Sequence, residues 1–122
     1  MTPWTEAGRT LAAEFARRAH ERFGDRVRRV VLFGSVVRGT DGPDSDVDVL
    51  VVADDRRSDL RDGLDAIAFD LTMQARRAIV FVLYPASTYD VARAHGSEFV
   101  AAVEREGKVL WTRSDTPSSM PA

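Results

Sequence analysis

The stretch that decides the fold spans residues 33–52 and reads FGSVVRGTDGPDSDVDVLVV. It begins at the end of one apolar run and finishes inside another, and the residues between them are rich in Gly, Asp and Pro. Asp46 and Asp48 alternate with valines, the pattern of a β-strand whose successive side chains point to opposite faces. The two carboxylates therefore share one face of the predicted strand, about 7 Å apart.

This pair of carboxylates has a chemical interpretation and a simpler one. Two carboxylates on one strand face repel each other unless water screens them or a cation lies between them, and carboxylate oxygens suit Mg²⁺ or Mn²⁺. Gly34 and Ser35 end the preceding run and could donate hydrogen bonds to phosphate, as could Arg38. Together these residues predict a site for a metal-bound nucleoside triphosphate. In the simpler interpretation the Asp-x-Asp only makes an exposed strand soluble.

The rest of the chain predicts an α/β (α+β) domain with a small mixed β-sheet flanked by helices. Apolar, β-branched runs predict strands at 27–33, 47–52, 78–84 and 108–112. Helical spacing of apolar residues predicts helices at 3–23, within 56–77, at 87–95 and at 97–107. The first two strands should pair antiparallel. Strand 78–84 is apolar on both faces and is expected to be central, whereas 108–112 is expected at an edge.

Composition limits the class of protein. The 122 residues suffice for one domain, expected over 1–112, with 113–122 forming a disordered polar tail. A net charge of −2 does not favour nucleic acid as a partner. The chain has no cysteine and no apolar run of the 18 or so residues that a membrane span needs, and its first residues are not expected to form a signal peptide. A cytoplasmic protein without a membrane partner is expected.

The run GSVVRGTDGPDSDVD resembles the signature of the minimal nucleotidyltransferases of the DNA polymerase β-like superfamily. That signature is Gly-Ser, ten intervening residues and Asp-x-Asp, and Gly34, Ser35, Asp46 and Asp48 fit it without a gap. The resemblance extends over most of residues 5–112. It implies the polymerase β-like nucleotidyltransferase fold.

The resemblance also implies an activity and a set of site residues. Members of the superfamily transfer a nucleoside monophosphate from a nucleoside triphosphate to an acceptor hydroxyl, with two metal ions around the α-phosphate. Asp46 and Asp48 would then be the catalytic and metal-binding residues, with Mg²⁺ or Mn²⁺ as the metal. Gly34 and Ser35 would hold the triphosphate of ATP or another nucleotide, and Arg38 and Ser45, which match frequent choices in the family, would assist.

One expected residue is missing. The active family uses a third carboxylate on a neighbouring strand, and the run AIVFVLY at 78–84 contains no Asp or Glu. Val80 is the residue that aligns with the missing acid, to within a residue or two. Asp70 is a possible substitute, although a solvated helix position is the simpler interpretation for it. Asp41 and Asp44 could reach a metal, but turn formation is the expected role for both.

Three functions follow as alternatives. Similar proteins are paired with a helical HEPN partner in toxin–antitoxin modules, where the nucleotidyltransferase is the antitoxin and adenylylates a tyrosine on the toxin. That resemblance implies ATP as the donor and a HEPN-like protein as the partner. The second alternative is a non-catalytic nucleotide- or partner-binding module, which the missing acid favours. The third is one subunit of an aminoglycoside-type nucleotidyltransferase.

Overall fold

The computed structural model describes residues 1–55 and 57–113. The helices and strands follow one another along the chain in the order α1 (Pro3–Phe23), η1 (Gly24–Arg26, a 3₁₀ turn), β1 (Val27–Phe33), α2 (Ser35–Arg38), β2 (Val47–Ala53), α3 (Ser58–Ala75), β3 (Ile79–Pro85), α4 (Ala86–Ala94), α5 (Glu98–Glu106) and β4 (Lys108–Thr112).

The strands form one mixed sheet in the order β3-β2-β1-β4. β1 pairs antiparallel with β2 and with β4, and β2 pairs parallel with β3. The parallel pair requires a crossover connection, which α3 supplies. The predicted antiparallel pairing of the first two strands and the edge position of the last strand are both confirmed.

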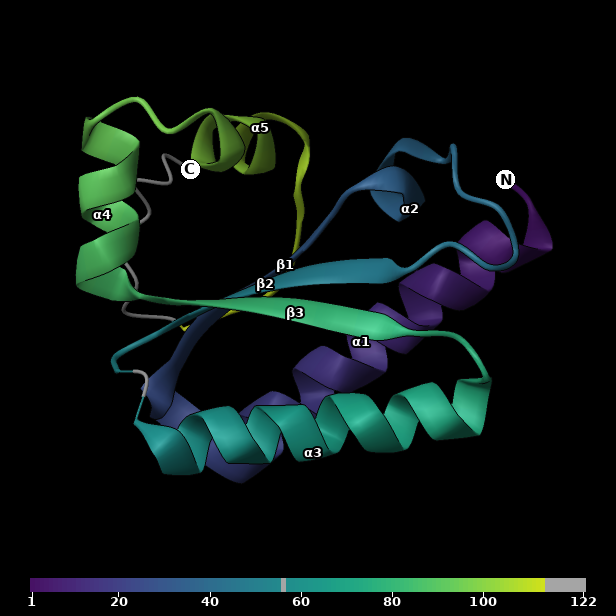
Figure 1. The fold of residues 1–122 in the computed structure, drawn as a ribbon, viewed down its shortest axis with the longest axis horizontal. Helices are drawn as coiled ribbons and strands as arrows, with labels where there is room; N and C mark the ends of the chain where they lie inside the picture. The colour runs from purple at the N-terminus through teal and green to yellow at the C-terminus, as the bar shows by residue number, and fades with distance from the viewer. Residues whose placement is uncertain (56, 114–122) are drawn as a thin grey trace.

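Helices cover both faces of the sheet (Figure 1). α1 and α3 lie on one face, where Phe15 and Leu64 pack against Val47, Val49 and Val51 of β2. α4 and α5 lie on the other face (Figure 1). α2 lies at the end of the sheet where β1 finishes and β2 begins, and its Val36 is buried in the core formed with α1 and α3. Because side chains alternate along β2, the strand contributes core residues to both faces of the sheet. The signature lies at one end of the sheet, where β1 finishes and β2 begins.

The second face carries a smaller core. Leu50 of β2 packs there with Tyr89 of α4 and with Val100 and Val103 of α5. Because side chains two residues apart share a face, Asp48 points to this same side of the sheet as Leu50. On this face of β2, Leu50 is a core residue, whereas Asp48, two residues earlier, is a carboxylate at the end of the sheet.

Strand β3 corrects one prediction. It lies at an edge of the sheet and not at its centre. Its residues are apolar on both faces because Ile79 and Leu83 pack toward α1 and α3, whereas Val82 and Tyr84 pack toward α4 and α5. Cover on both faces is thus compatible with an unpaired lateral edge, since the hydrogen-bonding direction lies in the plane of the sheet.

Side chains cap two of the helices at their first turn. Thr2 caps α1 by accepting a hydrogen bond from the Thr5 N–H, with Pro3 in the first turn, and Ser97 caps α5. The cap residue of α3 is Arg57, which makes no side-chain cap bond. The tail was predicted at 113–122, of which residues 114–122 lie outside the described part of the chain. Its first residue, Arg113, donates its backbone N–H to the Arg28 carbonyl at 2.8 Å.

Candidate functional site

The signature residues gather where β1 ends and β2 begins. Asp48 is the second residue of β2 and lies opposite Phe33, the last residue of β1. Asp46 lies just before β2 and is exposed, whereas Asp48 is half-buried. The antiparallel pairing of the two strands thereby brings the Gly34-Ser35 turn beside the Asp-x-Asp, as the sequence predicted for neighbouring strands.

Gly34 lies against the end of the Asp48 side chain. A Cβ added to Gly34 would lie 2.5 Å from Asp48 Oδ2, and the Gly34 φ angle of +84° belongs to a region that residues with a side chain rarely adopt. The positive φ angle favours glycine at this position, and a larger residue would also have to displace the Asp48 carboxylate. The backbone turn and the carboxylate therefore form one continuous surface.

Arg38 and Ser45, the other predicted nucleotide-binding residues, flank this surface. Arg38 ends α2, and its Nη1 lies 3.5 Å from Glu106 Oε1 of α5. Ser45 Oγ accepts a hydrogen bond from the Gly42 N–H at 2.9 Å, so Ser45 also holds the loop that leads into β2. A pocket of about 230 Å³ opens beside Gly34 and Arg38, between α2 and α5.

The electrostatics of the site centre on Asp48. Burial raises the pKa of the Asp48 carboxyl, and the negative charge of Asp46 raises it further, while Arg38 acts in the opposite direction. The folded protein therefore holds the Asp48 proton more tightly than the unfolded chain. The free energy of unfolding therefore falls as the pH rises from the pKa of an unfolded aspartate through the higher pKa of Asp48 in the folded protein, because ionisation costs more in the folded state.

We expect the substitution Asp48→Asn to raise the melting temperature at pH 7 in metal-free buffer, because it removes a half-buried charge that faces Asp46. The difference should vanish near pH 3, where aspartate is mostly protonated in both states. Thermal unfolding at the two pH values measures this effect. Asp44→Asn, which changes an exposed carboxylate of the same loop, should leave the melting temperature unchanged. A lower melting temperature of Asp48→Asn at pH 7 would contradict the prediction.

Val80 occupies the position next to Asp48 on the neighbouring strand. The parallel register of β2 and β3 pairs Asp48 with Val80, so their side chains share a face. Val80 is 43% exposed, which is high for a valine inside a strand. The position that the family resemblance assigned to the missing acid is thus adjacent to the signature, and it carries an apolar side chain that is 43% exposed to solvent.

Asp41 plays a different role from the one predicted. Its side chain is fully buried and pairs with Arg77, whose Nη2 lies 2.8 Å from Asp41 Oδ2, and the Thr5 hydroxyl also donates to it. Burial alone would raise the pKa of Asp41, but the hydrogen bonds from Thr5 and Arg77 hold it below its usual value. The prediction of turn formation was therefore wrong for Asp41, while Asp44 does lie in a turn.

No substitute for the third carboxylate stands out. Asp70 lies on α3, and its Oδ2 accepts from Arg18 of α1 at 2.7 Å, in the helical layer on the opposite face of the sheet from Asp48. Within residues 1–55 and 57–113, no three His, Cys, Asp or Glu side chains group so as to hold a metal ion. A metal at this site would accordingly have Asp46 and Asp48 as its protein ligands.

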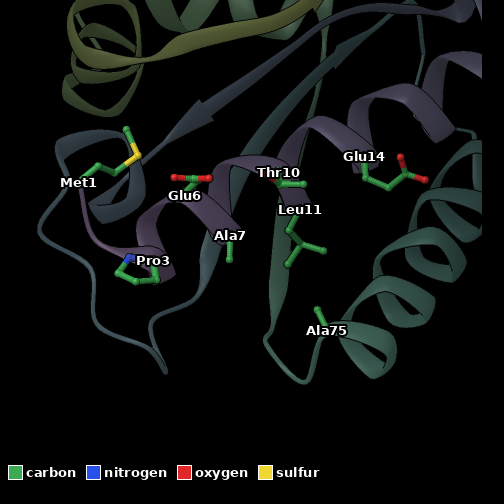
Figure 2. Close-up of a pocket in the computed structure, with 8 residues that line it drawn as sticks. All are labelled: Met1, Pro3, Glu6, Ala7, Thr10, Leu11, Glu14 and Ala75. Atoms are coloured by element: carbon green, nitrogen blue, oxygen red, sulfur yellow. The ribbon is translucent and has the colours of Figure 1, made fainter.

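A larger hollow lies away from the signature. It measures about 590 Å³ and runs between the first half of α1 and the end of α3. Figure 2 shows Glu6 and Glu14 on α1 and Ala75 at the end of α3. Arg17 and Arg18 pair with Glu14 and lower its pKa to about 2. The hollow contains no signature residue, so its size does not make it the functional site.

The helices of the described chain show no candidate membrane span, since none combines the necessary length and hydropathy. This finding concerns only the part of the chain that the structure describes.

Several solved structures share this fold, and chains of toxin–antitoxin complexes are among them. A chain of a toxin–antitoxin complex with AMP-PNP matches with a TM-score of 0.56 and 21% identity, over 84% of this chain and 74% of that one. A chain from a complex of the tri-AMPylated Shewanella oneidensis HEPN toxin with the MNT antitoxin matches with a TM-score of 0.54 and 17% identity, over 87% of this chain and 73% of that one. The crystal structure of a Sulfolobus solfataricus protein described as a putative nucleotidyltransferase matches with a TM-score of 0.53 and 15% identity, over 94% of this chain and 93% of that one.

The sequence itself matches one family model. No curated protein matches the chain, but the model of the nucleotidyltransferase domain matches residues 12–106. That range contains Gly34, Ser35, Asp46 and Asp48, together with β1, β2 and β3, which place them. The mixed sheet, the glycine that touches Asp48 and this match lead to one conclusion: the chain belongs to the nucleotidyltransferase domain family.

Proposed function

We propose that this protein binds a nucleoside triphosphate with Mg²⁺ or Mn²⁺ and transfers the nucleoside monophosphate group, AMP in the favoured case, to a hydroxyl group on a partner protein. The contact between Gly34 and Asp48 carries the proposal. A separation of 2.5 Å between Asp48 Oδ2 and the position of a Gly34 Cβ means that phosphate oxygens held at the turn would lie directly beside a carboxylate.

The residues present fit one metal ion that arrives with the phosphates. Asp46 and Asp48 repel each other enough to raise the pKa of Asp48 beyond the effect of burial, and a divalent cation bound to both would relieve this repulsion. Mg²⁺ commonly takes one or two protein carboxylates and completes its shell with water and phosphate. When bound, it would neutralise part of the phosphate charge.

The other signature residues would orient the triphosphate. Gly34 and Ser35 would offer backbone and hydroxyl donors at the turn, and Ser45 would offer its hydroxyl proton. Arg38 is half-exposed and its contact with Glu106 is long, at 3.5 Å, so its guanidinium could turn to phosphate with little loss of stability.

The transfer step would use this arrangement as follows. The acceptor oxygen forms a bond to the α-phosphorus, the bond from that phosphorus to the bridging oxygen breaks, and pyrophosphate leaves. The hydroxyl proton passes to water at the exposed rim beside Val80. Positioning by Gly34, Asp46 and Asp48 would supply part of the rate, and the lack of an acid at position 80 would keep the transfer slow.

A protein acceptor is supported by the similar structures. Two of them are toxin–antitoxin complexes, one with AMP-PNP and one with an AMPylated HEPN toxin. A HEPN-like toxin is therefore the proposed partner, and ATP the proposed donor. An aminoglycoside-type reaction, with a small molecule as the acceptor, is the alternative. Identification of the acceptor would distinguish the two reactions.

Val80 favours a second candidate function. An apolar residue stands next to Asp48, where the family resemblance implies a carboxylate that completes the second metal position. The domain would then bind a nucleotide or the partner without transferring NMP. The two candidate functions share the nucleotide site and differ only in the chemical step.

We expect the double substitution Asp46→Asn, Asp48→Asn to abolish Mg²⁺-dependent ATP binding while the protein stays folded, because it removes both metal-binding carboxylates and also their mutual repulsion. Isothermal titration calorimetry with Mg²⁺-ATP measures the binding, and circular dichroism checks the fold. The control is Asp62→Asn, Asp65→Asn on the exposed side of α3, which should bind as the wild type does. Unchanged affinity in the Asp46, Asp48 variant would refute the nucleotide site.

Transfer itself is tested with α-labelled ATP and Mg²⁺ or Mn²⁺, with and without the protein encoded beside this one. Label on that protein, absent with the Asp46, Asp48 variant, would support the transferase. Binding of ATP without any label would favour the binding module.

A further inference from the structure

We propose that the pocket between α2 and α5 holds the nucleobase of the bound nucleotide. The pocket has a volume of about 230 Å³, and its lining includes Phe33, Gly34, Arg38, Phe99, Ala102 and Glu106. The inference rests on the proposed nucleotide site and names the part of that site that would recognise the base.

Continuity with the phosphate-binding residues is the first argument. Gly34 of the signature and Arg38, another proposed nucleotide-binding residue, both line this pocket. A ligand whose phosphates contact these two residues therefore has the pocket directly beside it. The larger hollow along α1 has no such connection, because it is lined by α1, by the start of the chain and by Ala75.

The walls of the pocket suit a flat, apolar ring. Phe33 and Phe99 are both half-buried and meet edge to face, with ring centroids 5.2 Å apart and an interplanar angle of 86°. Ala102 contributes a small side chain between them and Glu106 on α5. Aromatic side chains are common platforms for nucleobases because every base offers a π-face.

The size of the pocket selects the part of the nucleotide that it can hold. Pockets for drug-sized ligands measure roughly 300–1,000 Å³, and 230 Å³ is smaller. The pocket thus has room for a ring system but not for a nucleotide with its phosphates. Arg38 and Glu106 line the pocket together, 3.5 Å apart, and the cationic Arg38 would lie toward the proposed phosphate site.

Calorimetry with two ligands tests this assignment. Mg²⁺-tripolyphosphate has the phosphates of ATP but neither ribose nor base. We expect the wild type to bind Mg²⁺-ATP at least about tenfold more tightly than Mg²⁺-tripolyphosphate, since stacking of one base contributes about that factor. Ala102→Trp fills the pocket and should lower the affinity for ATP to that for tripolyphosphate, while tripolyphosphate binding stays unchanged.

Two further variants make the test specific. Ala101→Trp places the same side chain on the exposed face of α5, one residue away, and should bind both ligands as the wild type does. Phe99→Leu keeps an apolar side chain but removes the aromatic ring, and should weaken ATP binding several-fold without affecting tripolyphosphate. Phe99→Leu also covers the case in which Ala102→Trp does not fold.

The outcomes separate this inference from the function on which it rests. The base pocket would be overturned if folded Ala102→Trp and Phe99→Leu both bound ATP as tightly as the wild type. It would also be overturned if these variants lost affinity for ATP and tripolyphosphate to the same extent. Neither result would contradict the phosphate site of the wild type. Equal affinity of the wild type for the two ligands would overturn the base pocket as well. Failure of the wild type to bind either ligand would overturn the proposed nucleotide site together with the base pocket.

Discussion

The substitution Val80→Asp is expected to increase the rate of NMP transfer at least about 100-fold over the wild type. General acid–base assistance typically contributes 10²–10⁴-fold, and a carboxylate at this position would also help to hold a second metal ion. The register of the sheet places position 80 directly beside Asp48. No backbone movement is needed to bring the new carboxylate to the site.

The fold should tolerate this substitution because Val80 is 43% exposed. An aspartate there can remain hydrated, so the desolvation cost that a buried carboxylate would incur is largely avoided. Without metal, a third negative charge should raise the pKa of Asp48 further. With metal bound, the same charge should strengthen metal binding.

Single-turnover transfer of label from α-labelled ATP to the acceptor measures the effect. Val80→Asn has nearly the same shape as Val80→Asp without its charge and should show no gain. Val109→Asp introduces the same residue at a strand valine with 49% exposure on β4, away from the signature, and should behave as the wild type does. A wild type that already transfers rapidly, with no gain in Val80→Asp, would show that position 80 is not the missing catalytic position.

Removal of the buried carboxylate in Asp41→Ala should lower the free energy of unfolding by about 3–5 kcal/mol, the usual cost of leaving one member of a buried ion pair without its partner. The side chain of Asp41 is 0% exposed and that of Arg77 is 8% exposed. Urea denaturation at pH 7 measures the loss. Asp44→Ala, in the same loop but exposed, should change the free energy by less than about 0.5 kcal/mol.

The pair also holds the loop that leads to the site. Arg77 Nε donates to the Ser45 carbonyl at 2.8 Å, immediately before Asp46, and Trp4 Nε1 donates to the Asp41 carbonyl at 2.8 Å. In the double variant Asp41→Ala, Arg77→Met, the loss should be smaller than the sum of the two single losses, because no unpaired charge stays buried. Additive losses would show that the two side chains act independently.

Local sequence was sufficient for most of the secondary structure and for the signature. The β-branched run at 27–33 coincides with β1 (Val27–Phe33). The helices predicted at 3–23 and 97–107 coincide with α1 and, to within one residue at each end, with α5. These features depend on residues within one or two turns of each other, so their physics is contained in a short window.

The same local information accounts for the main error in the sheet. A run such as 78–84 reveals that both faces of a strand will be covered, since coverage depends on which side chains are apolar. It does not reveal whether another strand pairs at the lateral edge, because the backbone groups that form such pairs are the same for nearly every residue. The edge position of β3 thus depends on the order of strands, which the crossover through α3 decides.

By itself, the sequence determined the mixed fold and the absence of an acid in 78–84, and it predicted that Gly34, Ser35, Asp46 and Asp48 form one site. Only the tertiary structure decided which residues from distant segments meet. It placed Val80 beside Asp48, buried Asp41 against Arg77 across 36 positions, and opened a pocket between α2 and α5 at Gly34. The physical reason is that propensity and periodicity act over a few residues, whereas burial and charge pairing depend on packing between segments far apart in the chain.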